Sequence, residues 1–312
     1  MDIIYFDKSR YESVLGKREI ESLFPLGGGF AHIIVNLSFN EGPGLVFKFN
    51  PPNESKFTFH GLDLNTEFKF LSRCANAGYI NVPRPIMLDE SCSIFPTPFI
   101  VLEKIEGDNL DKRIAEERST EGKKRLISRG IDELIRLHEI DPGEVNFIPR
   151  YRNFAEYRMD RLKKLTKDIK VNRLILESVE ELQRRFPIEE ESRVIHNDFS
   201  FYQMIYSKGA IYCLDFDSVC MGDPTWDILW MFKGREEWFG FNDETEFIVN
   251  SYEEKSKRTL KNLGFYGLYS CVKAYLITMT VKQAAAEDHP LRSILKYEKM
   301  IEEDLKKKIS SS

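Results

Sequence analysis

The chain has 312 residues, with 45 lysines and arginines against 50 aspartates and glutamates, so its net charge is −5, and 42% of its residues are apolar. At roughly 150 residues per domain, this length suggests two domains or lobes, and the composition is that of a folded globular protein, not of a disordered chain. The sequence has neither a basic arm nor an apolar run of about 20 residues, which argues against nucleic-acid binding and against a membrane span.

The first hundred residues are expected to form strands and one helix. Apolar residues alternate with other residues over positions 33–39, and this period of two predicts a strand. Asn-Glu-Gly-Pro-Gly at positions 40–44 predicts a turn, and residues 45–49 then form the return strand. A spacing of four between Glu67, Leu71 and Ala75 predicts a helix from about Leu64 to Ala77.

The chain after residue 107 is expected to be mostly helical. A short apolar strand, Phe99–Leu102, precedes this region, and residues 193–215 interrupt it with a strand, a polar loop and a hairpin. These patterns predict an α+β protein with two lobes, a strand-rich N-terminal lobe of residues 1–104 and a mainly helical C-terminal lobe of residues 105–312. A cleft between such lobes is a natural place for a ligand.

Three glycines and two charged residues suggest phosphate binding in the first lobe. Gly27, Gly28 and Gly29 precede a strand, whereas a dinucleotide fingerprint would open a helix, so we interpret them as a loop that covers phosphates. Taken alone, such glycines more often belong to a turn, and Lys48 or Glu67 alone is typical of a solvated surface. In the order glycine loop, strand lysine, helix glutamate, they predict an ion pair that holds the ammonium against nucleotide phosphates.

A further set of polar residues lies between positions 196 and 227. It reads His196-Asn197-Asp198, then Gln203, then Leu214-Asp215-Phe216-Asp217, then Gly222-Asp223-Pro224 and Asp227. With the glycine loop, and with the strand and Glu-Gly-x-x-Leu motif at positions 99–110, this segment resembles the aminoglycoside phosphotransferase and choline kinase family. The members of that family share the protein-kinase fold, and the resemblance extends from about residue 26 to residue 232.

The resemblance implies roles for individual residues. Asp198 is implied to take the proton of an acceptor hydroxyl, and it follows a buried strand, as that task requires. A Mg²⁺ ion is implied at Gln203 and Asp215, since magnesium prefers oxygen ligands, and Asp217 is either a further ligand of that ion or an acidic residue of the loop. The implied nucleotide-binding residues are Gly27, Gly28, Gly29, Lys48, Glu67, Glu103 and Ile105.

The chain departs from the family pattern at two positions. Gln203 stands where the family usually has Asn, and it keeps the amide oxygen but adds a methylene. Asn197 stands where the family usually has Gly, and Asn tolerates left-handed backbone geometry. Asp223 and Asp227 are expected to cap or brace the helix that follows them, and His138 is expected in the core.

The segment after Asp217 bears on the kind of acceptor. Only four residues separate Asp217 from Gly222-Asp223-Pro224, so there is no room for a long activation segment, and no Ala-Pro-Glu follows, which favours a small acceptor over a protein. We therefore predict an ATP- or GTP-dependent phosphotransferase that acts on a hydroxyl group of a small molecule, with an aminoglycoside or an amino alcohol as candidates. The alternatives are a nucleotide-binding pseudokinase or regulatory module, and an unorthodox protein kinase.

The remaining expectations concern the cellular compartment and the partners of the protein. Five cysteines without a close pair predict reduced thiols, and the first residues have no features of a signal peptide, so we expect a cytoplasmic protein. Neither a nucleic acid nor a membrane is expected as a partner. The sequence does not determine the oligomeric state.

Overall fold

The computed structural model describes residues 3–16, 18–25, 32–51, 64–167, 169–231, 244–285, 287 and 290–310. The chain divides into two compact units, and each is described by itself. The first comprises residues 1–110, 144–147 and 203–218, and the second comprises residues 111–143, 148–202 and 219–312. Residues 203–218 thus pack with the N-terminal segment, although a long stretch of the second unit precedes them in the chain.

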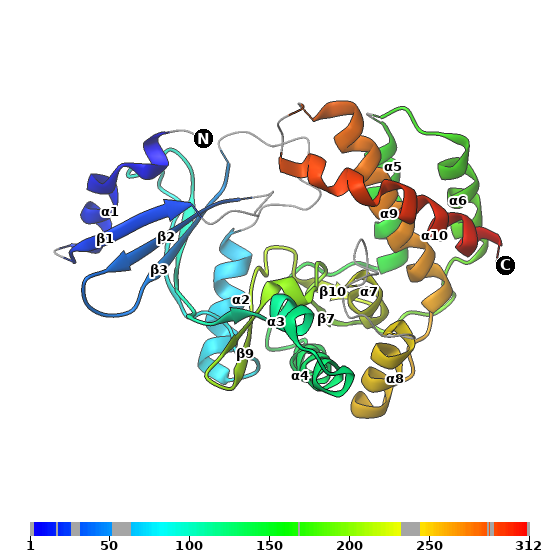
Figure 1. Cartoon of the computed structure of the whole chain (residues 1–312), viewed down its shortest axis with the longest axis horizontal. Coiled ribbons are helices and arrows are strands. Elements are labelled where there is room, and N and C mark those ends of the chain that lie inside the picture. Colours follow the sequence, from blue (N-terminus) through cyan, green and yellow to red (C-terminus); the bar gives the residue numbers. More distant parts are fainter. Residues whose placement is uncertain are drawn as a thin grey trace. The chain divides into compact units, whose positions relative to one another are not determined.

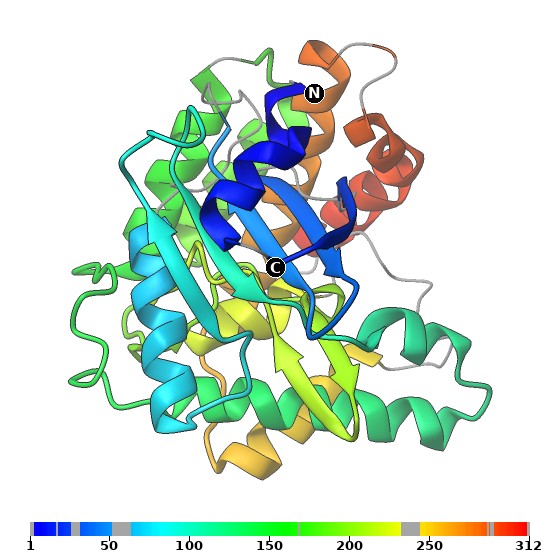
Figure 2. The ribbon, with the colours of Figure 1, turned by 90° about the vertical axis from the view of Figure 1, so that its left-hand side faces the viewer.

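An antiparallel sheet of five strands forms the centre of the first unit. Its strands follow the order β1-β2-β3-β5-β4, with the bounds β1 Ile20–Pro25, β2 Ile33–Phe39, β3 Leu45–Phe49, β4 Pro85–Asp89 and β5 Phe99–Glu103. The helix α2, Leu64–Ala77, packs against β4 and β5 (Figure 2). Its bounds match the predicted helix, and Gly78 ends it with a φ of 68°.

Aromatic side chains form the core on one side of β3. The rings of Phe47 and Phe49 are fully buried and lie 4.8 Å from Tyr11 and 5.1 Å from Tyr5, respectively, measured between ring centroids. Because side chains alternate along a strand, Lys48 faces the opposite side of the sheet. The sheet therefore buries apolar rings on one side and presents a lysine on the other.

The N-terminal helix was not predicted. The structure has a short 3-10 helix, Ile3–Phe6, and the helix α1, Lys8–Leu15, beside β1, so the expectation of one helix in this region was wrong (Figure 1). Asp7 caps α1 by accepting a hydrogen bond from the Ser9 backbone N–H. Only Tyr11 of α1 is fully buried, so the helix has a weak apolar stripe and gives little signal in the sequence.

A second sheet of the first unit carries the segment from residue 203 onward. Its order is β6-β8-β9, with β6 Asp108–Asn109, β8 Met204–Ser207 and β9 Ala210–Cys213. The predicted hairpin is therefore confirmed, with its turn at Lys208 and Gly209, which both have positive φ. The Cys213 backbone N–H donates to the carbonyl oxygen of Asn81 at 2.9 Å, which ties the hairpin to the rest of the unit.

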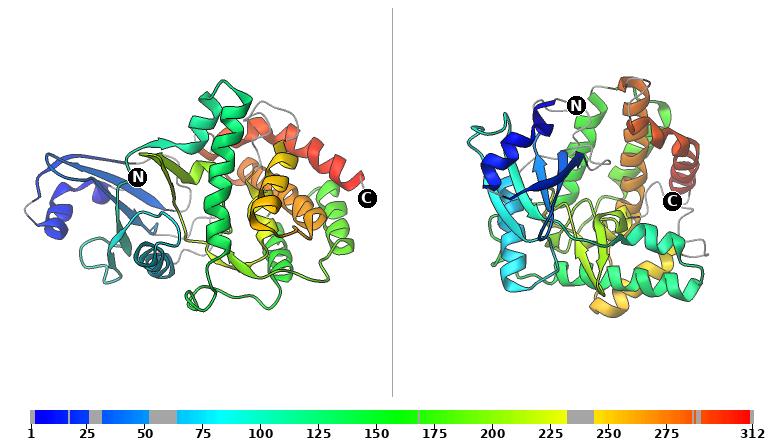
Figure 3. Two further views of the ribbon diagram at one scale, coloured as in Figure 1. Left: turned by 90° about the horizontal axis from the view of Figure 1, so that it is seen from below. Right: turned by 60° about the vertical axis from the view of Figure 1, so that its left-hand side comes forward.

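The second unit consists mainly of helices around α9, Leu263–Ala284. Against α9 pack α5 Phe154–Lys167, α6 Arg173–Arg184, α7 Pro224–Trp230, the 3-10 helix Pro290–Tyr297 and α10 Glu298–Ser310 (Figure 3). The helix α4, Thr120–His138, packs against α8, Glu244–Ser256, and α3 spans Leu110–Glu116. The strands β7, Arg193–Ile195, and β10, Cys220–Gly222, pair antiparallel.

The predicted fold class, α+β with strands first and helices afterwards, is confirmed. Among the residues that the structure describes, no helix has the length and apolar character needed to cross a membrane.

Candidate functional site

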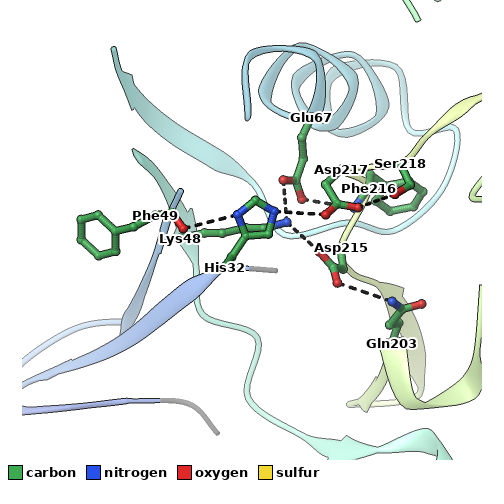
Figure 4. Close-up of polar contacts among 9 residues, drawn as sticks. All are labelled: His32, Lys48, Phe49, Glu67, Gln203, Asp215, Phe216, Asp217 and Ser218. Carbon is green, nitrogen blue, oxygen red and sulfur yellow. Dashed lines mark hydrogen bonds and ion pairs between the residues drawn. The ribbon is translucent and has the colours of Figure 1, made fainter. Parts of the chain in front are cut away.

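A buried lysine of the first unit lies between two carboxylates (Figure 4). The Nζ atom of Lys48 is 2.7 Å from Oε2 of Glu67 and 2.6 Å from Oδ1 of Asp215. The side chains of Lys48 and Glu67 are almost completely buried, whereas that of Asp215 is 40% exposed. The predicted ion pair between Lys48 and Glu67 is confirmed, and Asp215 joins it.

Three elements bring these residues together. Lys48 comes from β3, Glu67 from the first turn of α2, and Asp215 from the segment after β9. The second oxygen of Glu67, Oε1, accepts the backbone N–H of Phe216 at 3.1 Å, so one glutamate fixes both the lysine and the segment that carries Asp215. Asp215 has a φ of 65°, a left-handed conformation that is uncommon outside glycine.

The charges of this cluster depend on one another. Burial alone would lower the pKa of Lys48, but the carboxylates of Asp215 and Glu67 outweigh it, and the pKa lies well above that of an ordinary lysine. Burial raises the pKa of Glu67 to about 7, although Lys48 acts in the opposite direction. The ammonium is therefore a permanent charge at neutral pH.

Asp217 has a histidine partner (Figure 4). The ring of His32 has Nε2 3.0 Å from Oδ2 of Asp217 and Nδ1 3.3 Å from the carbonyl oxygen of Phe49. Both partners accept hydrogen bonds, so only the doubly protonated ring donates to both, and a neutral ring keeps one of the two bonds. Burial and the Lys48 ammonium lower the pKa of His32, against the effect of Asp217. Sequence reasoning missed this contact, since nothing in the local pattern links positions 32 and 217.

Gln203 lies beside Asp215, as a shared cation site requires (Figure 4). Its Nε2 atom is 3.4 Å from Oδ2 of Asp215, and a rotation of the amide by 180° would turn its oxygen toward the same carboxylate. Within the described part of the chain, no three His, Cys, Asp or Glu residues form a preassembled metal cage. Carboxylate and amide oxygens fit magnesium, which is usually held by one or two carboxylates together with water and phosphate oxygens.

Asp198 belongs to the second unit and lies in the loop after β7. It is half-buried, and its Oδ1 accepts the indole N–H of Trp230 at 2.7 Å. Asp198 and the Lys48 cluster belong to different units of the chain. That Asp198 and Asp215 act on one phosphate stays a prediction.

The loop that carries Asp198 is held by a buried carboxylate. Asp227 accepts the backbone N–H groups of His196 at 2.7 Å and Asn197 at 2.8 Å, and it lies 3.2 Å from Nε2 of His138. Asn197 has a φ of 73°, the left-handed geometry expected at this position. Asp227 therefore braces the Asp198 loop more than the helix that follows it.

Two further residues of this region lie as predicted. Asp223 caps α7 by accepting the Thr225 backbone N–H at 2.9 Å. His138 is fully buried, with Nδ1 2.7 Å from the hydroxyl of Tyr252. His196, at the start of the loop that carries Asp198, is buried as well.

A buried basic residue near Asp198 was missed by sequence reasoning. Lys273 of α9 is 3% exposed, and its Nζ atom lies 3.7 Å from the centroid of the Trp230 ring. Burial lowers the pKa of Lys273 to about 7, and the carboxylate of Asp198 acts in the opposite direction. The only signal in the sequence is a lysine inside a long apolar helix.

The remaining predicted residues lie at or before the strands of the first unit. Glu103 ends β5, where its backbone N–H donates to the carbonyl oxygen of Arg84 at 2.9 Å, and the half-buried Ile105 follows it. The predicted phosphate loop of Gly27, Gly28 and Gly29 lies outside the described residues.

Comparisons with known proteins agree on one family. The model of the phosphotransferase enzyme family matches residues 40–258. A protein of Ralstonia eutropha, provisionally named an aminoglycoside phosphotransferase, has a TM-score of 0.75 at 15% identity, with 98% of each chain covered. The GDP and kanamycin complex of APH(2")-IIIa has a TM-score of 0.69 at 18% identity, with 98% of this chain and 99% of that one covered.

A choline kinase belongs to the same structural group. LicA of Streptococcus pneumoniae has a TM-score of 0.67 at 17% identity, with 98% of each chain covered. At these identities, the likeness shows a common fold. No curated protein sequence matches the chain. None of these comparisons supports the pseudokinase alternative.

Proposed function

The chain belongs to the phosphotransferase enzyme family and is a small-molecule kinase, and we propose that it moves the terminal phosphoryl group of ATP or GTP to a hydroxyl group of its acceptor. The observation that carries this proposal is the lysine held between two carboxylates in the first unit. A permanent buried ammonium beside a half-exposed aspartate is suited to a polyanionic ligand. The GDP bound by APH(2")-IIIa supports a nucleotide as the donor.

On the donor side, Lys48 neutralises charge on the nucleotide phosphates, and Glu67 holds the lysine in place. Gly27, Gly28, Gly29, Glu103 and Ile105 are the further residues that we assign to nucleotide binding. The three-way contact of Glu67 with the Lys48 ammonium and the Phe216 backbone N–H keeps this arrangement fixed before the ligand binds.

Asp215 and Gln203 would hold a Mg²⁺ ion through a carboxylate and an amide oxygen, and Asp217 would join them by giving up its contact with His32. When bound, such an ion neutralises charge on the transferred phosphoryl group. The residues of the chain supply the fixed oxygens, and Lys48 keeps one oxygen of Asp215 oriented.

On the acceptor side, Asp198 takes the proton of the attacking hydroxyl group. The indole N–H of Trp230 fixes one oxygen of Asp198 and so helps to orient the carboxylate. Asp227 keeps the loop in its left-handed turn and so sets the position of the base. Kanamycin, bound by APH(2")-IIIa, supports a small molecule with hydroxyl groups as the acceptor.

The test is a screen for nucleotide consumption with ATP and with GTP, each with and without Mg²⁺. Acceptors are aminoglycosides, amino alcohols, sugars and homoserine, and the phosphorylated product is identified by mass spectrometry. With the acceptor found, Asp198→Asn should lower kcat by about 100-fold or more, because general-base catalysis contributes at least that much. Asp160→Asn is the matched control, since Asp160 is an exposed residue of the same unit in a surface ion pair with Lys163. A full rate in Asp198→Asn would refute the assignment.

A further inference from the structure

Two tryptophans and a lysine form a stacked group in the second unit. The rings of Trp226 and Trp230 are stacked, with centroids 5.1 Å apart and an interplanar angle of 19°. The Nζ atom of Lys273 lies 3.7 Å from the centroid of Trp230 and 5.2 Å from that of Trp226. This is the geometry of a cation–π contact, and the cation belongs to the protein itself.

The group is directly connected to Asp198. The indole of Trp230 that carries the lysine on its face donates its N–H to Asp198 at 2.7 Å. Lys273 also interacts electrostatically with Asp198, which opposes the lowering of the lysine's pKa by burial. The amine, the ring and the proposed base are therefore neighbours within one unit.

A second internal cation, the guanidinium of Arg158, contacts Trp226 of the same aromatic pair. The guanidinium carbon of Arg158 is 3.9 Å from the centroid of Trp226, and Arg158 is only 2% exposed. Arg158 also donates a hydrogen bond to the side-chain oxygen of Asn197, next to Asp198 in the chain. Both aromatic rings beside the proposed base thus already have cationic partners.

This arrangement bears on the acceptor. An aromatic face beside the base is where a protein would hold the ammonium of a cationic acceptor, as aromatic cages hold choline. Here Lys273 lies against Trp230 on the side where Trp226 stacks, so the protein's own amine already occupies that side of the ring. A second cation beside Asp198 would meet a like charge whenever Lys273 is protonated.

We propose that Lys273 is a specificity-determining residue, which limits the acceptor to molecules with a neutral or anionic group next to the reacting hydroxyl and rejects those with an ammonium there. This inference rests on the proposed function, because it takes Asp198 as the group that faces the acceptor. It separates this chain from kinases of amino alcohols, and it narrows the candidate acceptors to polyhydroxyl compounds and hydroxy acids.

The first measurement compares acceptors that differ in charge at similar shape. One pair is 3,3-dimethylbutan-1-ol and choline, and the other set is glucose, gluconate and glucosamine. Initial rates of nucleoside diphosphate release give kcat/KM for each compound with the wild-type protein. We expect the neutral or anionic member of any series that reacts to have a kcat/KM at least tenfold above that of the cationic member.

The second measurement uses Lys273→Met, which keeps the length of the side chain and removes the amine. We expect kcat/KM for the cationic member to rise about tenfold relative to the neutral one, mainly through KM. Lys282→Met is the matched control, because Lys282 lies on the same helix, is exposed and pairs with Glu298 at the surface. If Lys273→Met fails to fold, the wild-type preference alone decides.

Binding of tetramethylammonium, followed by saturation-transfer NMR, decides the case in which neither series reacts. Binding to Lys273→Met but not to the wild type supports the proposal, whereas equal binding to both proteins, or to neither, overturns it. A wild-type preference for choline or glucosamine also overturns it and leaves the proposed function intact. Absence of nucleotide turnover with every hydroxyl compound and with water is a failure of the proposed function itself.

Discussion

The buried ion cluster of the first unit makes a quantitative prediction about stability. In Lys48→Met, the carboxylate of Glu67 stays buried, at 1% side-chain exposure, and loses its ammonium partner. Removing one partner of a buried pair costs about 3–5 kcal/mol where the remaining group stays charged, and at pH 8 the buried Glu67 must either stay charged or take up a proton. In Lys48→Met/Glu67→Gln both charges are gone, and only Asp215 loses its partner. Because Asp215 is 40% exposed, water takes over most of that interaction.

The double variant should therefore be more stable than Lys48→Met by about 2 kcal/mol, although it carries one substitution more. Glu67→Gln alone should cost less than Lys48→Met, because Lys48 keeps Asp215. The pH dependence of the free energy of unfolding is an independent test of the buried Glu67 carboxyl group. The folded-state pKa of Glu67, about 7, lies above the ordinary value of 4.5, so the free energy of unfolding falls as the pH rises through this interval. Without Lys48 the pKa of Glu67 rises further, so the free energy of unfolding continues to fall above pH 7.

The assay is urea unfolding followed by far-UV circular dichroism at pH 6 and at pH 8. The deficit of Lys48→Met relative to the wild type should be larger at pH 8. Lys299→Met serves as the control, since Lys299 is 91% exposed, and it should lie within about 0.5 kcal/mol of the wild type. Additive costs in the double variant, or a deficit that does not change with pH, would refute this account of the cluster.

Three more changes have defined outcomes in the same unfolding assay. Asp227→Asn removes an acceptor oxygen from the buried carboxylate that holds the Asp198 loop, so we expect a loss of about 2–3 kcal/mol and, in the kinase assay, a lower kcat. Gly222→Ala places a methyl group 2.5 Å from a side-chain carbon and 2.9 Å from an aromatic ring, which should cost about 1–3 kcal/mol, whereas Gly264→Ala has its nearest neighbour at 4.0 Å and should cost nothing. The folded-state pKa of Lys273, about 7, lies below the ordinary value of 10.5, so the unfolded chain binds the extra proton and the free energy of unfolding should rise from pH 7 to pH 9, by up to about 2–3 kcal/mol. Lys273→Met should lack this rise, and an identical rise in the variant would contradict the burial of a titrating lysine.

Local elements were predictable from the sequence because their signals are local. The helix over Leu64–Ala77 has its apolar positions four apart and a glycine directly after its end, and the hairpin at 204–213 has a Lys-Gly turn between two apolar runs. The sequence also allowed recognition of a strand lysine, a helix glutamate and the polar residues around Asp198, because these residues occur in a characteristic order along the chain. The helix Lys8–Leu15 was missed because it is short and buries a single aromatic side chain completely.

The contacts that define the site depended on tertiary structure. Lys48 and Asp215 are 167 positions apart, and His32 and Asp217 are 185 apart, so no periodicity relates them. The sequence predicted that Asp227 braces the following helix, but it could not show that Asp227 holds the backbone of the Asp198 loop. It gave no prediction for Lys273. Folding alone decides which charged side chains leave water and which partners they meet there. The carboxylates of Glu67 and Asp215 keep Lys48 charged although it is buried, whereas Lys273 is buried beside a tryptophan ring and its pKa falls.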